Sequence, residues 1–173
     1  MNSWADDLIG HLERSADVIR AIVRMTSPEQ QTWKPDSNSD PWSVLEVIGH
    51  LLDEEREDFR VRLGLVLENP EIGWPAIDPQ GWVNERSYAT RDLDESLALL
   101  LTERRESVQW LRGLRNPEWA SAKNHPLGAL SAGDLLASWT AHDLLHIRQL
   151  VRLHLQYVQQ RARPYSTDYA GEW

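Results

Sequence analysis

The sequence has no cysteine among its 173 residues. This absence excludes disulfide bonds, cysteine-ligated zinc sites and a cysteine nucleophile within the chain. Thiol chemistry would therefore need a thiol supplied by another molecule. Phenylalanine occurs once and methionine twice, whereas tryptophan occurs nine times. Tryptophan can line a pocket, but more commonly it fills a hydrophobic core.

Basic residues are also few. There are 18 Lys and Arg against 27 Asp and Glu, which gives a net charge of -9. We therefore expect neither nucleic acid nor an anionic membrane as a partner. No apolar run is long enough to span a membrane, and the opening stretch MNSWADDLIGHLERS lacks the apolar segment of a signal peptide. A cytoplasmic location is the expectation that follows.

The composition is that of a globular protein, with 41% hydrophobic and 26% charged residues. The length suits one domain with a core of its own. We expect a single domain over residues 1–173, with an irregular tail over about 162–173.

Four long segments have apolar residues at helical spacing, and no alternating strand pattern lies between them. We expect helices over about residues 3–25, 43–68, 92–114 and 131–160. Ser43 and Glu46 have the spacing of a capping box at the start of the second helix. The pattern predicts an all-α four-helix bundle. The connections over 70–91 and 115–130 are long, which is typical of segments that cover a pocket.

Two histidines fall on the apolar face of the last helix. At about 100° per residue, His142 and His146 share a narrow sector with Leu135, Trp139, Gln149, Leu153 and Tyr157. Imidazoles four residues apart lie one turn apart on the same face, which suits the binding of one metal ion. Alternatively, both are core residues with hydrogen-bond partners, because an unpaired buried polar group is costly.

A metal ion would need a third ligand, and periodicity leaves several candidates. His154 lies off the apolar face of its helix, and His11 has acidic and polar neighbours. His50 belongs to a more polar row of the second helix, together with Glu54, while His125 lies in a loop. The pattern alone ranks His50 only slightly above His125.

The segments PWSVLEVIGHLLDEE and NHPLGALSAGDLLASWTAHDLLHIRQL resemble the DinB-like superfamily. This group of four-helix bundles includes bacillithiol transferases and the metal-binding domain of mycothiol-dependent maleylpyruvate isomerase. The matching features are a Trp-Ser helix start, a histidine in that helix, a His-Pro loop, and His-Asp-x-x-His followed by glutamine. The resemblance covers nearly the whole chain.

The resemblance implies a site for one divalent metal ion, with His50, His142 and His146 as its ligands. Zinc and nickel are the expected metals, and iron also suits imidazole ligands. The resemblance further implies unusual helix connectivity and a homodimer. His125 matches a loop histidine that is not a ligand. Three protein ligands leave a coordination position open, as in catalytic zinc sites.

The resemblance implies that a low-molecular-weight thiol binds at the open position. The metal activates its sulfur, which then attacks an electrophile. The resemblance therefore implies a metal-dependent transferase with a small-molecule substrate. The alternative is a non-catalytic bundle that a metal stabilises and that acts as a binding module. A zincin peptidase is disfavoured because Asp143 stands where zincins have glutamate. An HD phosphohydrolase is also disfavoured, because the histidine motifs of that family lie closer together in the sequence than His50 and His142 do.

Further residues are candidates for supporting the ligands or lining a pocket: Glu54, Trp139, Asp143, Gln149 and Tyr157. Gln149 lies on the apolar face one turn after the last ligand and could bond it. Glu54 follows the first ligand by one turn, with a surface ion pair as the alternative. Asp143 lies about a quarter turn from the ligand face, which favours a surface position. Trp139 and Tyr157 are expected in the core or in a pocket wall.

Overall fold

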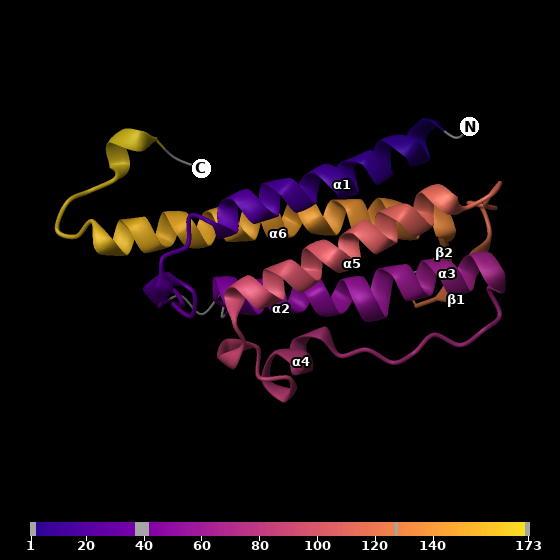
Figure 1. Ribbon diagram of the computed structural model, residues 1–173, viewed down its shortest axis with the longest axis horizontal. Helices are drawn as coiled ribbons and strands as arrows, with labels where there is room; N and C mark the ends of the chain where they lie inside the picture. The colour runs from indigo at the N-terminus through magenta and orange to yellow at the C-terminus, as the bar shows by residue number, and fades with distance from the viewer. Residues whose placement is uncertain (1–2, 37–41, 127, 172–173) are drawn as a thin grey trace.

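The computed structural model describes residues 3–36, 42–126 and 128–171. Four long helices run along the long axis of the molecule (Figure 1). They are α1 (Ser3–Val23), the continuous helix α2–η2–α3 (Val44–Glu54, Glu55–Phe59, Arg60–Glu68), α5 (Leu93–Gly113) and α6 (Ala132–Arg161). The predicted four-helix bundle is confirmed. Among the described residues, no helix combines the length and apolar character required to cross a membrane.

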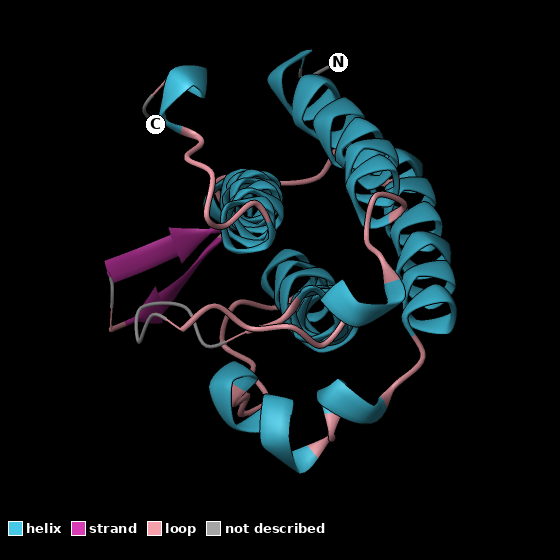
Figure 2. Cartoon of the chain, turned by 90° about the vertical axis from the view of Figure 1, so that its left-hand side faces the viewer, coloured by secondary structure: helices cyan, strands magenta, loops and turns pink. Residues whose placement is uncertain are grey.

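Each long helix packs mainly against two others. Helix α1 packs against α6 and α5, and α2 also packs against α5 and α6. The end-on view in Figure 2 shows the same arrangement. Successive helices α1 and α2 therefore lie diagonally across the bundle, as do α5 and α6. A diagonal crossing needs a longer connection than a turn between neighbours, which accounts for the long segment before α6.

Capping boxes begin both helices that carry the candidate metal ligands. At the start of α2, Ser43 Oγ accepts from the Glu46 amide at 3.3 Å, and the Ser43 amide donates to the Glu46 carboxylate at 2.7 Å. Ser131 and Asp134 form the same reciprocal pair at the start of α6. Each pair satisfies two amides that would otherwise lack partners, so it fixes where the helix begins.

The second long helix contains a π-helical turn, η2, over Glu55–Phe59. The apolar periodicity did not predict this turn. The Glu55 side chain within it is only 1% exposed, and Phe59 packs beside a candidate ligand, His142. Such turns are rare within α-helices and often occur at functional sites.

The connection over 70–91 folds against α2. It contains α4 (Pro79–Glu85) and the 3-10 turn η3 (Tyr88–Thr90). Tyr88 donates its hydroxyl to Asp53 at 2.6 Å, and its ring lies directly over Gly49. A Cβ at Gly49 would come within 2.8 Å of that ring, so this close approach requires glycine at that position.

A short antiparallel hairpin precedes α6, and the sequence pattern did not predict it. Strand β1 (Ala122–His125) pairs with β2 (Gly128–Ser131). Each strand has four residues, too few to display a clear alternation of apolar and polar side chains. Over residues 162–171, the C-terminal tail has one 3-10 turn, η4 (Asp168–Ala170), and is otherwise irregular.

Two hydrophobic clusters fill the bundle, one toward each end. The first includes Ile19 of α1 and Leu100 of α5, and the second includes Leu12 and Val108 of the same helices. Between the two clusters lies a layer of buried or partly buried polar side chains: Ser15, His50, Glu55, Arg104, His142, Asp143 and His146. The three candidate ligands belong to this polar layer.

Candidate metal centre

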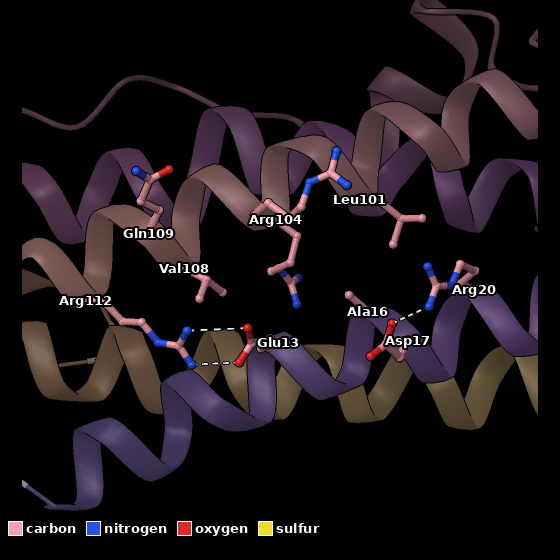
Figure 3. Close-up of a pocket in the computed structure, with 10 residues that line it drawn as sticks. Glu13, Ala16, Asp17, Arg20, Leu101, Arg104, Val108, Gln109 and Arg112 are labelled. Carbon is pink, nitrogen blue, oxygen red and sulfur yellow. Dashed lines mark hydrogen bonds and ion pairs between the residues drawn. The ribbon is translucent and has the colours of Figure 1, made fainter.

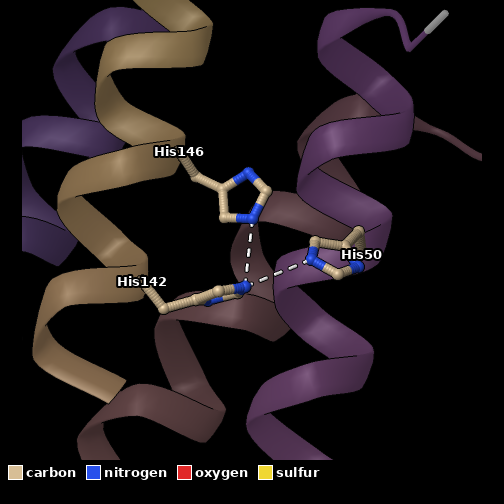
Figure 4. A group of neighbouring side chains, drawn as sticks. All are labelled: His50, His142 and His146. Atoms are coloured by element: carbon tan, nitrogen blue, oxygen red, sulfur yellow. Dashed lines mark hydrogen bonds between the residues drawn. The ribbon is translucent and has the colours of Figure 1, made fainter. Parts of the chain in front are cut away.

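Helices α2 and α6 bring three histidines together. Figure 4 shows His50 of α2 opposite His142 and His146 of α6, with the rings facing one another. The Nε2 atom of His142 lies 3.3 Å from that of His50 and 3.0 Å from that of His146. Ligand atoms from all three residues lie within 4.8 Å of one another. Nitrogens bound to a tetrahedral zinc ion at about 2.0–2.1 Å would be about 3.3 Å apart, which is close to the two distances from His142 Nε2.

Hydrogen bonding alone explains this cluster less well. The Nε2 atom of His142 faces two neighbouring nitrogens at hydrogen-bond distance. A ring nitrogen has either one proton or one lone pair. It would therefore have to share that single proton or lone pair between His50 and His146. A cation at the centre would accept a lone pair from all three nitrogens.

The electrostatic surroundings keep two of the ligands neutral. Burial, with smaller contributions from His146 and then His142, lowers the pKa of His50 to about 3. Burial, followed by His146 and then Arg104, lowers the pKa of His142 to about 3. Both imidazoles are therefore uncharged at neutral pH, which is the form that binds a metal ion.

Gln149 orients the third ligand. Its Oε1 atom lies 2.6 Å from His146 Nδ1, and because an amide oxygen only accepts, Nδ1 must carry the proton. The lone pair of His146 then lies on Nε2, which faces the other two histidines. His50 Nδ1, by contrast, is buried without a hydrogen-bond partner among the described residues. Such unpaired groups are rare in native proteins, which favours a functional reason for burying His50.

Replacing Gln149 with leucine is expected to weaken metal binding by about 10–100-fold, the usual effect of losing a partner that orients a ligand. Leucine removes the acceptor from His146 Nδ1 but keeps a similar volume. Competition with a chromophoric chelator measures the affinity. Gln160→Leu, at an exposed position of α6, is the control. Equal affinity in the two variants would contradict the orienting role.

Two aromatic side chains pack against the histidines. The Trp42 ring lies 4.8 Å from that of His50, and it is nearly parallel to that of His146 at 6.5 Å. Phe59 lies 5.0 Å from His142 and stacks on Trp139 at 5.8 Å. These contacts restrict rotation of the imidazoles. The sequence pattern did not indicate Trp42 or Phe59 as part of the site: Phe59 belongs to the apolar face of the second helix, and Trp42 precedes that helix.

A network of buried charges lies beside the histidines. The Arg104 guanidinium of α5 donates to both oxygens of Glu55 at 2.9 Å and to Asp143 Oδ1 at 2.8 Å. Ser15 also donates to Asp143, and the Trp139 indole donates to Glu55 at 3.0 Å. Burial opposes the charge on Arg104, but the two carboxylates raise its pKa above the ordinary value. The network joins α1, η2, α5 and α6.

The surface position favoured for Asp143 is wrong. Its side chain is 1% exposed and pairs with Arg104, not with a ligand imidazole. Arg104 itself was not identified, although it falls on the apolar stripe of α5 between Leu97, Leu100, Val108 and Leu111. A charged residue at such a position is the sequence signal that a buried partner exists.

The remaining predicted residues are Glu54, Tyr157 and Trp139. Glu54 is buried, and one of its carboxylate oxygens has no hydrogen-bond partner in the described parts of the chain. Burial, followed by the charge of Asp58, raises the pKa of Glu54 to about 8. Tyr157 packs edge-on against Trp33. Trp139 is buried next to Phe59, so it belongs to the wall of the site.

The other histidines are not part of the cluster. His11 is exposed on α1. The His125 ring lies 5.4 Å from that of Trp74, at the hairpin. His154 Nδ1 lies 3.0 Å from Gln30 Nε2, away from the ligands. Of the candidates that periodicity left open, the structure therefore places His50 beside the pair on α6.

A hollow of about 450 Å³ lies between α1 and α5, away from the three histidines. Figure 3 shows Glu13 paired with Arg112 and Asp17 paired with Arg20 along it. The hydrogen bonds within these pairs are 2.7 and 2.6 Å long. These four charged side chains are paired with one another, so none of them points to a ligand in the hollow.

Comparison with known proteins agrees with this architecture. The sequence model of the DinB superfamily matches residues 11–150, a segment that includes all three clustered histidines. Among solved structures, the chain is similar to YfiT from Bacillus subtilis, a probable metal-dependent hydrolase with an unusual four-helix bundle topology. The two share 22% sequence identity, with a TM-score of 0.79 over 91% of this chain and 89% of YfiT. At that identity the likeness supports the fold alone. Curated proteins give no match.

Proposed function

The chain belongs to the DinB superfamily, and from this premise we propose that it is a metal-dependent transferase that uses a low-molecular-weight thiol. His50, His142 and His146 hold one divalent ion, for which zinc and nickel are preferred over iron. The second substrate is a small electrophile. The observation that carries the proposal is the convergence of the three Nε2 atoms. That of His142 lies 3.3 Å from that of His50 and 3.0 Å from that of His146.

The residues around the ligands suit this chemistry. An ion with three imidazole ligands supplies a Lewis acid with an open position for a thiol sulfur or a water. Gln149 fixes the lone pair of His146 toward the centre, and Trp42 and Phe59 hold the other two rings. With no cysteine in the chain, the thiol comes from another molecule.

Hydrolysis is the second candidate function. YfiT, whose fold is similar, is a probable metal-dependent hydrolase, and the same open position would activate water. The non-catalytic bundle is the third. The three candidate functions differ in what binds the metal, because a thiol binds it only in the transferase.

The first test measures metal content by mass spectrometry in the wild type, His50→Ala and His142→Ala, with His11→Ala as an exposed control. We expect about one equivalent of a divalent metal in the wild type and the control, and a loss in the two ligand variants. Protein without metal, even after reconstitution, would contradict the site.

The second test titrates cobalt-loaded protein with cysteine and glutathione. A thiolate bound to cobalt produces a charge-transfer absorption band in the near ultraviolet. Its appearance with either thiol supports the transferase. A protein that takes up cobalt but shows no such band with either thiol would contradict the transferase and favour hydrolysis or the non-catalytic bundle.

A further inference from the structure

A cavity of about 700 Å³ lies along α6 next to the metal centre. His146 and Gln149 are among the residues that line it, so it adjoins the ligand set directly. The lining also includes Arg148, which lies between these two residues in the sequence, and Arg152 and Gln156, which lie beyond them in the C-terminal direction. His146 and these side chains therefore border the same space.

The charge of this cavity is opposite to that of the whole chain. Its lining, as far as the structure describes it, has two arginines and no acidic residue, although the chain has a net charge of -9. Arg148 and Arg152 are four residues apart, so their side chains leave the same face of α6 one turn apart. A divalent ion at the three histidines would add further positive charge. Such a surface attracts anions.

We propose that the molecule that reacts at the metal centre has an anionic oxygen group, a carboxylate or a phosphate, that binds Arg148 and Arg152. This inference rests on the proposed function and adds the substrate class to it. The guanidinium group offers paired N–H donors whose spacing matches two oxygens of either anion. Arg148 makes no ion pair with any described acidic residue.

The helix sets how far the arginines lie from His146 along its axis. At about 1.5 Å rise per residue, Arg148 lies about 3 Å and Arg152 about 9 Å beyond His146, and both side chains leave α6 about 120–160° around the helix from the imidazole. Leu145 and Leu155 line the same cavity and provide apolar surface for the linking atoms.

The test is calorimetric titration of zinc-loaded protein with adipate and with hexanoate. The two probes have the same chain length and one carboxylate for the metal, but only adipate has a second. We expect the wild type to bind adipate at least fivefold more tightly than hexanoate. Arg148→Gln/Arg152→Gln should remove this preference and leave hexanoate binding unchanged. Arg115→Gln, at an exposed position outside the cavity, should retain it.

A third probe, 5-phosphonopentanoate, distinguishes the two anions, since it has a phosphonate where adipate has its second carboxylate. Equal affinity for adipate, 5-phosphonopentanoate and hexanoate in zinc-loaded wild type, or a preference that survives in the double variant, would overturn the inference. That result leaves the thiol titration of the proposed function unaffected. A wild type that takes up no zinc overturns both, and the zinc content of each sample identifies that case.

Discussion

Replacing Arg104 with methionine is expected to lower the free energy of unfolding by about 3–5 kcal/mol, the usual effect of removing one partner from a buried ion pair. The guanidinium is 4% exposed and pairs with Glu55 and Asp143, each 1% exposed. Methionine keeps much of the apolar stem but leaves two buried carboxylates facing each other without a cation. Urea unfolding followed by circular dichroism measures the change.

Two variants separate this effect from a general response to mutation. Arg105→Met changes the neighbouring arginine, which is exposed, and should stay within about 0.5 kcal/mol of the wild type. Arg104→Met combined with Glu55→Gln and Asp143→Asn removes all three charges and should recover part of the loss. A loss below about 1 kcal/mol in the single variant would contradict the network as a determinant of stability.

The sequence allowed the bundle to be predicted because each long helix has a continuous apolar stripe and a recognisable start. The capping residues Ser43 and Ser131 mark where α2 and α6 begin. The hairpin before α6 was not predictable in this way, because strands this short depend on pairing with each other. The π-turn at Glu55–Phe59 likewise depends on partners in other helices, notably Arg104 and Trp139.

The metal centre was predictable only in part. Spacing within α6 related His142 to His146, but it contained no information about which residue of another helix lies opposite. The choice of His50 came from the family resemblance, because its own periodicity is ambiguous. Asp143 was misplaced since α6 packs against both α1 and α2. A helix with two neighbours buries a wider arc than the single stripe that contains the histidines.

The polar layer connects the Arg104 network with the metal centre. His142 and Asp143 are adjacent in α6 but point to different partners, the histidine toward α2 and the aspartate toward Arg104 of α5. Phe59 of the π-turn contacts His142 and stacks on Trp139, and the Trp139 indole donates to Glu55 of the same turn. The charged network thus fixes α5, α6 and η2 relative to one another, beside His50 and His142, which burial keeps uncharged.

Zinc added to metal-free protein is expected to raise the free energy of unfolding by about 4 kcal/mol when free zinc is about 1,000 times its Kd. The folded chain presents three imidazoles to one point, and the unfolded chain does not, so binding favours the folded state. Thermal unfolding at increasing zinc concentrations measures the effect. His11→Ala should show the full rise in melting temperature, whereas His142→Ala should show almost none.

The same titration bears on whether the metal serves structure or chemistry. The Arg104 network already joins the four helices without a metal ion, so we expect metal-free protein to unfold cooperatively from a folded state. In that case zinc adds stability to an existing bundle, and its open coordination position is available for reaction. A metal-free protein that is unfolded at 25 °C would instead indicate that the ion is a structural requirement. An equal rise in His142→Ala would place zinc binding outside the three histidines.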